Sequence, residues 1–249
     1  MENVCQNHYI ERTSIFDGIR LFCFPYAGAG ASVFKTWREM FEYIKVYPLQ
    51  YPGRENRIME RPIPDIKILV DEIYDELKYS IQECPFIMFG HSLGTKLVYE
   101  LSLKIYNEKK IWPKGVIVSG GRAPNLIEPN PIYSLDDESF IRELVKRYSS
   151  IPNEIANNKE MMSLFLPALR ADFIMDEKYI KNKVDKIDCP IMGLIGTEDS
   201  EMTFDDLNKW SDFTMKEFSY KYIEGDHMFI NKNGNEVIAA IKKFVKKLK

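Results

Sequence analysis

Short apolar runs alternate along this chain with longer stretches whose apolar residues recur every three or four positions. The expected buried strands are residues 19–24, 45–51, 86–89, 115–119 and 189–195. One helical stretch follows Asp65, a good helix cap, and carries Ile66, Leu69, Ile73, Leu77 and Ile81. This alternation predicts an α/β fold with a mostly parallel central sheet and helices on both faces.

Three further elements complete the predicted pattern. A first helix is expected over residues 34–44, and the alternating run 218–223 predicts a late strand. A last amphipathic helix carries the apolar stripe Val237, Ile241, Phe244 and Leu248. Its many lysines are interpreted as the solvated face of that helix.

The alternation stops between residues 122 and 185, where prolines punctuate a loop. Residues 135–148 and 160–179 are predicted helices, the second kinked or split at Pro167. Helices inserted between two core strands are typical of a lid over an active site. We therefore expect one domain over residues 1–249 with a helical lid insertion at 122–185.

The residues Gly90-His91-Ser92-Leu93-Gly94 lie between a predicted strand and a predicted helix. A nucleophile elbow requires this context, because its serine occupies a sharp strand-to-helix turn with glycines where the backbone is most crowded. The alternative, a glycine-flanked surface serine, becomes weaker once the flanking elements are considered. Ser92 is therefore the candidate nucleophile of an α/β-hydrolase fold.

A serine nucleophile needs a base, and the chain has only three histidines. His91 is adjacent to Ser92 and should point away from its hydroxyl, while His8 lies in a polar stretch before the first strand. His227 follows the late strand at 218–223, where an α/β-hydrolase places its base. Elimination and chain order both favour His227.

The third member of a triad should be a carboxylate between Ser92 and His227 in sequence, at a strand end. Asp199 fits best, since it follows the predicted strand 189–195 through a glycine turn. Glu198 remains a close competitor. Asp226 is weaker, because a residue next to the base rarely folds back onto its ring.

The loop of small residues at 25–32 follows the first strand. Such a loop lets backbone amides approach a ligand, and Ala27 and Leu93 are the candidate oxyanion-hole donors. Val33 stands where the third glycine of a dinucleotide-binding fingerprint would fall, so that function is disfavoured.

The second predicted helix of the insertion has an apolar stripe that includes Met161, Met162, Phe165, Leu166 and Leu169. This stripe could line an acyl pocket; the alternative is that it only packs the insertion onto the core. The predicted substrate-contacting residues are Tyr26, Met161, Phe165 and Met228.

Whole-chain properties narrow the class of protein. A net charge of −3 gives no electrostatic case for nucleic-acid binding. The four cysteines are widely spaced and suggest neither zinc nor a disulfide framework. Neither a signal peptide nor a membrane span is predicted, so the expected location is the cytoplasm. A monomer is expected, without a metal or cofactor of its own.

Six segments together resemble a type II thioesterase, the stand-alone editing hydrolase of nonribosomal peptide and polyketide synthases. The matching segments are residues 24–28, 50–57, 90–94, 165–172, 196–199 and 225–229. Generic lipases and esterases lack the segments at 50–57 and 165–172, which makes these two the most specific. The resemblance spans roughly residues 19–245.

This resemblance implies hydrolysis of acyl or aminoacyl groups from the phosphopantetheine thiol of carrier proteins, which clears stalled synthases in antibiotic biosynthesis. It also implies Ser92, Asp199 and His227 as the triad, with Ala27 and Leu93 as oxyanion donors. Three alternatives remain open: a carboxylesterase for small esters, an acyltransferase or cyclising release enzyme, and a catalytically silent binding protein.

Overall fold

The computed structural model describes residues 18–148 and 158–248. Within them lies a six-stranded sheet in which every neighbouring pair is parallel, in the order β2-β1-β3-β4-β5-β6. The strands are β1 (Ile19–Phe24), β2 (Ile44–Pro48), β3 (Phe86–His91), β4 (Gly115–Ser119), β5 (Ile191–Gly196) and β6 (Phe218–Ile223). The predicted α/β fold with a parallel sheet is confirmed.

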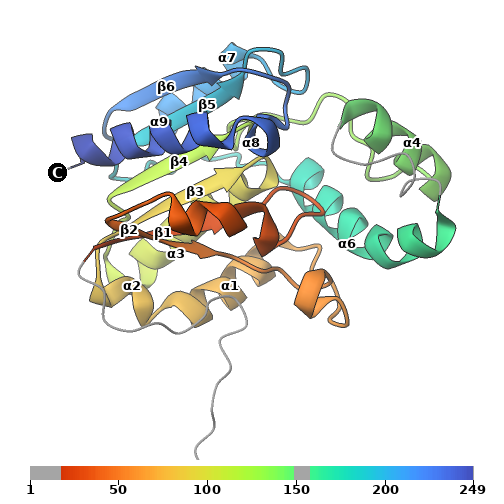
Figure 1. The fold of residues 1–249 in the computed structure, drawn as a ribbon, viewed down its shortest axis with the longest axis horizontal. Helices are drawn as coiled ribbons and strands as arrows, with labels where there is room; N and C mark the ends of the chain where they lie inside the picture. Colours follow the sequence, from red (N-terminus) through yellow and green to blue (C-terminus); the bar gives the residue numbers. More distant parts are fainter. Residues whose placement is uncertain (1–17, 149–157, 249) are drawn as a thin grey trace, which may run out of the picture.

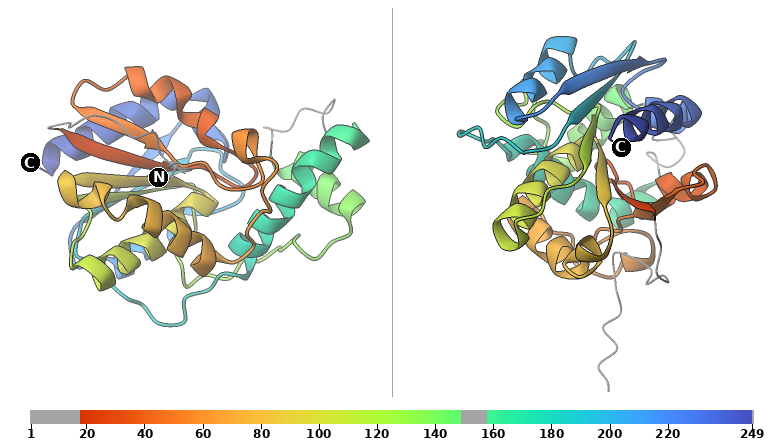
Figure 2. Two further views of the ribbon diagram at one scale, coloured as in Figure 1. Left: turned by 90° about the horizontal axis from the view of Figure 1, so that it is seen from below. Right: turned by 90° about the vertical axis from the view of Figure 1, so that its left-hand side faces the viewer.

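Helices cover both faces of this sheet (Figures 1 and 2). The α-helices are α1 (Ile66–Leu77), α2 (Ser80–Glu83), α3 (Leu93–Lys109), α4 (Asp137–Arg147), α6 (Lys159–Lys178), α7 (Phe204–Asn208), α8 (Phe229–Lys232) and α9 (Gly234–Lys247). The 3₁₀ helices are η1 (Ala31–Glu39), η2 (Glu55–Arg57) and η3 (Lys209–Phe213). In Figure 2, α1 and α3 lie on one side of the sheet, and η1 and α9 on the other.

The sheet therefore has a hydrophobic cluster on each of its two faces. Along β1, Phe22 points into the cluster shared with α1 and α3, whereas its neighbour Leu21 points into the cluster shared with η1 and α9. Both side chains are fully buried. Successive residues of a strand point to opposite faces of the sheet. Because both faces are buried here, the strands are continuous apolar runs and do not alternate between apolar and polar residues.

The helix predicted over residues 34–44 is wrong in type and extent. The structure has the 3₁₀ helix η1, and β2 already begins at Ile44. Phe34 and Trp37 are buried with their ring centroids 5.0 Å apart. Residues three apart eclipse one another in a 3₁₀ helix, so an apolar spacing of three does not distinguish this helix from an α-helix.

The second predicted helix of the insertion is not split at Pro167, because α6 continues through this residue. Proline removes the hydrogen bond to the carbonyl of Ser163, but that residue is exposed and its carbonyl can bond water.

The Asp65 cap predicted for the helix that follows it is confirmed, because its side chain accepts hydrogen bonds from Lys67 N and Ile68 N. Ile81 lies beyond α1, in the separate α2.

Residues 122–185 lie within the connection between β4 and β5 and contain α4 and α6; we call them the α4–α6 insertion. Both helices stand beyond one end of the sheet, at the right of Figure 1. They share a hydrophobic cluster of their own, and Ala27 from the loop after β1 packs against it. The insertion therefore contacts the core domain next to the predicted oxyanion loop.

Candidate active site

Ser92 lies at the sharp turn between β3 and α3, with φ +53° and ψ −118°. A positive φ is strained for a residue with a side chain, and such strain concentrates at functional sites. The turn is held by a hydrogen bond of 2.8 Å from Ser92 N to the carbonyl of Ser119 on β4. The elbow geometry predicted for Ser92 is therefore present in the backbone.

Two glycines make this turn possible. A Cβ atom on Gly90 would lie 2.2 Å from the carbonyl oxygen of Gly94, and one on Gly94 would lie 2.3 Å from that of Phe24. Both contacts are with backbone, which cannot move aside. The glycines thus let β3, α3 and the end of β1 meet where Ser92 projects.

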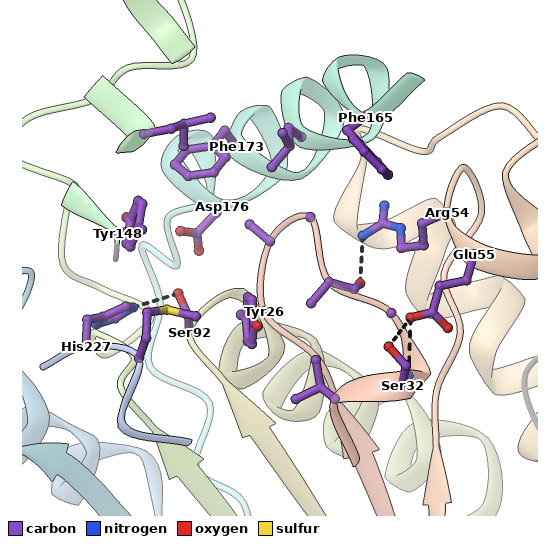
Figure 3. A pocket seen from close by; sticks show the side chains of 18 of the residues that line it. Tyr26, Ser32, Arg54, Glu55, Ser92, Tyr148, Phe165, Phe173, Asp176 and His227 are labelled. Atoms are coloured by element: carbon purple, nitrogen blue, oxygen red, sulfur yellow. Dashed lines mark hydrogen bonds between the residues drawn. The ribbon is translucent and has the colours of Figure 1, made fainter. Parts of the chain in front are cut away.

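The structure brings Ser92, His227 and Asp199 together from the ends of three strands, β3, β6 and β5. His227 Nε2 lies 3.2 Å from Ser92 Oγ (Figure 3). On the other side of the ring, Nδ1 lies 3.1 and 3.0 Å from the two carboxylate oxygens of Asp199. This is the hydrogen-bond chain that a serine nucleophile needs for its activation.

The competing acids are placed differently. The side chain of Asp199 is fully buried, whereas Glu198 is exposed. Asp226 accepts a hydrogen bond from Met228 N and pairs with Lys232, so it stabilises its own loop. Asp199 is therefore the carboxylate that bonds His227 Nδ1. His8, the remaining histidine, lies outside the described residues.

The charge state of His227 is set by two opposing effects. Burial lowers its pKa, but the negative charge of Asp199 and its hydrogen bond to Nδ1 outweigh burial, so the pKa lies above its usual value. Asp199 is therefore placed to stabilise the imidazolium that would form if His227 accepted a proton.

His91 has a role that the sequence did not reveal. Its Nε2 bonds the backbone carbonyl of His227 at 3.0 Å, and its Nδ1 lies 2.9 Å from Ser119 Oγ. Because a carbonyl only accepts, Nε2 carries the proton and Nδ1 accepts from the serine. Burial and the neighbouring His227 lower the pKa of His91 well below its usual value. A neutral His91 thus fixes the backbone that carries His227.

The two predicted oxyanion donors come from different segments, the start of α3 and the loop after β1. Leu93 is the first residue of α3, and amides in the first turn of a helix have no partner within it. Ala27 lines the cavity that also contains Ser92 and His227. The next amide in the loop, from Gly28, is already bonded to Asp172 Oδ2 at 2.7 Å.

Asp172 joins the two segments that made the family resemblance specific. Its carboxylate accepts two hydrogen bonds from the Arg54 guanidinium, at 2.5 and 2.9 Å, and both side chains are buried. Arg54 also donates to the carbonyl of Ala29. One buried ion pair therefore connects α6, the segment at 50–57 and the loop that carries Ala27.

A cavity of about 360 Å³ extends from Ser92 between this loop and the α4–α6 insertion. Its size suits a small organic ligand. Apolar side chains from the insertion form one wall: Leu144, Tyr148, Met162, Phe165, Leu169 and Phe173 (Figure 3). Tyr26 and Met228, both predicted to contact substrate, line it as well.

Of the residues predicted to contact substrate, Met161 does not line this cavity. It is 38% exposed and is absent from the cavity wall, which contains Met162 instead. Successive residues of an α-helix point about 100° apart, so the inner face of α6 includes 162, 165 and 169 but not 161. The sequence gives the spacing of apolar residues along α6, but it does not give the direction in which each of them points.

Within the described ranges 18–148 and 158–248, no group of three or more histidine, cysteine or acidic residues is arranged to hold a metal ion. Nor is any helix in these ranges long and apolar enough to cross a membrane.

Comparison with known proteins gives a consistent result. The family model of the thioesterase domain matches residues 19–245. The gramicidin S biosynthesis protein GrsT of Aneurinibacillus migulanus is 36% identical over 222 residues, covering 88% of this chain and 86% of GrsT.

Two solved structures are similar over nearly the whole chain. ClbQ, from the colibactin pathway of nonribosomal peptide and polyketide synthesis, has a TM-score of 0.86 at 28% identity and covers 93% of this chain and 98% of ClbQ. YbtT, a type II thioesterase from the yersiniabactin pathway, has a TM-score of 0.84 at 26% identity and covers 94% of both chains.

Proposed function

The chain belongs to the thioesterase domain family and is a thioester hydrolase, and from that premise we propose its substrates and the residues that act on them. The substrates are acyl and aminoacyl groups on the phosphopantetheine arm of carrier proteins in nonribosomal peptide or polyketide synthases. Relatives named for gramicidin S, colibactin and yersiniabactin biosynthesis support this assignment. Removal of unwanted groups from stalled carriers is the editing role.

Acylation begins at Ser92. His227 Nε2 accepts the hydroxyl proton over the 3.2 Å hydrogen bond, and Oγ attacks the thioester carbonyl carbon. The amides of Ala27 and Leu93 donate to the carbonyl oxygen as it becomes negatively charged. The C–S bond then breaks, and the imidazolium of His227 protonates the departing pantetheine sulfur.

In deacylation, water replaces Ser92 as the attacking nucleophile. His227 accepts a proton from a water molecule, which attacks the acyl carbon of the Ser92 ester. The acid is released, and the proton on His227 returns to Ser92 Oγ. Asp199 keeps the imidazole oriented and stabilises its charged form in both half-reactions. Every proton transfer uses these side chains and water, so the proposal needs no cofactor bound to this chain.

One observation carries the proposal: the hydrogen-bonded Ser92, His227 and Asp199 open onto a mostly apolar cavity large enough for an acyl group. The α4–α6 insertion supplies much of that cavity's wall and acts as a lid over Ser92. The enzyme functions as a cytoplasmic monomer that docks a carrier protein.

The test is to incubate the protein with carrier proteins loaded with acetyl, longer acyl or aminoacyl phosphopantetheine and to follow the intact carrier mass. The expected result is loss of the acyl mass with return of the free thiol, abolished in Ser92→Ala. A protein that leaves acyl-carriers intact but cleaves small free esters is a generic esterase and overturns the proposal. Acid as product excludes acyl transfer and cyclisation.

A further inference from the structure

Two cavities meet at Ser92. Beside the large apolar one lies a recess of about 40 Å³, and four residues line both: Ser92, Tyr148, Asp176 and His227. A water molecule needs roughly 10–15 Å³ of such volume, so the recess accepts a water-sized polar group but no branched aliphatic chain. A substrate bound at Ser92 thus faces two compartments of different size.

The recess also differs in chemistry from the large cavity. Three carboxylates line it, those of Glu128, Asp176 and Glu201, against two cationic groups, those of Lys96 and Arg122. Arg122 is engaged by Glu128, at 3.6 Å, and by the carbonyl of Glu201. This negative charge acts on His227. Asp199 makes the largest contribution to raising its pKa, and Glu201 and Asp176 contribute further.

Of the three carboxylates that line the recess, Asp176 alone also lines the large cavity. It projects from α6 into the space beside Ser92 and His227 (Figure 3). Lys96 Nζ lies 2.7 Å from Asp176 Oδ1 and donates to the backbone carbonyl of the same residue at 2.7 Å. Within residues 18–148 and 158–248 no group donates a hydrogen bond to Asp176 Oδ2. That oxygen can accept one from a ligand.

We propose that Asp176 is a specificity determinant that selects α-aminoacyl thioesters with a free ammonium group over acyl thioesters that lack one. The inference rests on the function proposed above. In an α-aminoacyl group, the carbon next to the reacting carbonyl carries both an ammonium and a side chain. With the carbonyl at Ser92, the side chain enters the large apolar cavity and the ammonium enters the recess.

The ammonium then donates a charge-assisted hydrogen bond to Asp176 Oδ2, within a recess whose carboxylates outnumber its cations. Lys96 opposes this binding, because its own ammonium lies in the same recess. It is held on Oδ1 and the main chain, away from Oδ2. Removal of the Lys96 charge should therefore strengthen the preference, whereas removal of the Asp176 charge should weaken it.

The same recess could instead hold the water that hydrolyses the acyl-enzyme. In that case Asp176 would affect every substrate equally, because the water is common to all of them. A substrate pair that differs only in the ammonium group separates the two roles.

The test uses one carrier protein loaded either with L-leucyl or with 4-methylpentanoyl phosphopantetheine, which is leucyl without its ammonium. For each variant kcat/KM is measured on both substrates, after subtraction of uncatalysed hydrolysis, and expressed as the leucyl to 4-methylpentanoyl ratio. Comparison of this ratio between variants cancels the different intrinsic reactivity of the two thioesters.

Asp176→Asn should lower the ratio by about tenfold or more, the usual cost of a hydrogen bond between charged groups. Lys96→Met should raise it. Since Asp176→Asn leaves Lys96 without its counter-charge, the double variant D176N/K96M, with neither charge, is measured too and should also show a lowered ratio. The control is Asp75→Asn, which removes an exposed carboxylate of α1 that pairs with Lys78, and it should leave the ratio unchanged.

An unchanged ratio in both Asp176→Asn and D176N/K96M, with both substrates still released, overturns the inference but leaves the proposed function intact. Equal loss on both substrates also overturns it and assigns Asp176 to the water or to the fold. If the wild-type protein releases neither group from any loaded carrier, the proposed function itself has failed.

Discussion

The cavity has two sides that are built in different ways. On the core side, Ser92, Asp199 and His227 stand at the ends of β3, β5 and β6, where parallel strands and tight turns fix the backbone. On the other side, the α4–α6 insertion contributes side chains from helices that have their own small hydrophobic cluster. In the proposed function, the first side carries out the chemistry and the second determines which substrates reach it.

The ion pairs of the two sides show the same contrast. In the Asp199–His227 pair, the Asp199 charge raises the pKa of His227 against the effect of burial, and the same imidazole bonds Ser92 Oγ. The Arg54–Asp172 pair instead joins α6 to the loop that carries Ala27. Substitutions on the core side should therefore remove rate, whereas those in the insertion should change stability and selectivity.

The largest effect is expected from Ser92→Ala, which removes the nucleophile but leaves the elbow backbone in place. By the precedent of other serine triads, kcat should fall by about 10⁶-fold. Single-turnover kinetics on an acyl-carrier measure this, and circular dichroism confirms the fold. A well-folded variant that turns over at the wild-type rate would refute the role of Ser92.

Asp199→Asn should lower kcat by about 10⁴-fold, because the amide no longer orients the imidazole or stabilises its charged form. The carboxylate charge raises the pKa of His227, so its removal lowers that pKa. Only neutral His227 acts as base; the acidic limb of the kcat/KM profile should therefore move to lower pH. Glu198→Gln, on the exposed neighbour, is the matched control. An unmoved limb would argue that Asp199 does not act on His227.

Asp172→Asn should destabilise the protein by about 3–5 kcal/mol, since it leaves the buried Arg54 guanidinium without its counter-charge. The control is Asp137→Asn, which breaks a pair with Arg170 but lies 68% exposed and should cost less than about 1 kcal/mol. Urea unfolding measures both. Equal losses in the two variants would show that the buried pair does not tie the insertion to the core domain.

The smallest effect is expected in the cavity wall, and two residues of equal exposure isolate it. Phe165 and Met161 are both 38% exposed on α6, but only Phe165 lines the cavity. Phe165→Ala should lower kcat/KM for a long acyl-carrier by about tenfold, whereas Met161→Ala should change it little. Chain-length profiles for both variants measure this. Parallel profiles would place the acyl chain elsewhere.

The two sides also differ in how far the sequence predicted them. The elbow at Ser92, the order of the triad residues along the chain and most strand bounds follow from local signals, namely turn glycines and short apolar runs. The triad geometry agrees with the prediction, although its catalytic role stays a prediction until it is measured. Turn chemistry of this kind depends on only a few neighbouring residues.

What the sequence missed depends on contacts between distant segments. Arg54 and Asp172 are 118 positions apart, and His91 bonds a carbonyl 136 positions away. The rotation of α6, which places Met162 but not Met161 in the cavity wall, is set by packing against α4 and the loop at Ala27. Periodicity gives the spacing of such a stripe but not the direction it faces.

The most direct test of the account is titration with a serine-reactive phosphonate, because only an activated serine reacts with it rapidly. We predict incorporation of one phosphonate per chain, mapped by mass spectrometry to the peptide that contains Ser92, with loss of acyl-carrier hydrolysis in proportion. Full hydrolysis by protein whose Ser92 is completely modified, or modification of a different serine with loss of activity, would contradict the account.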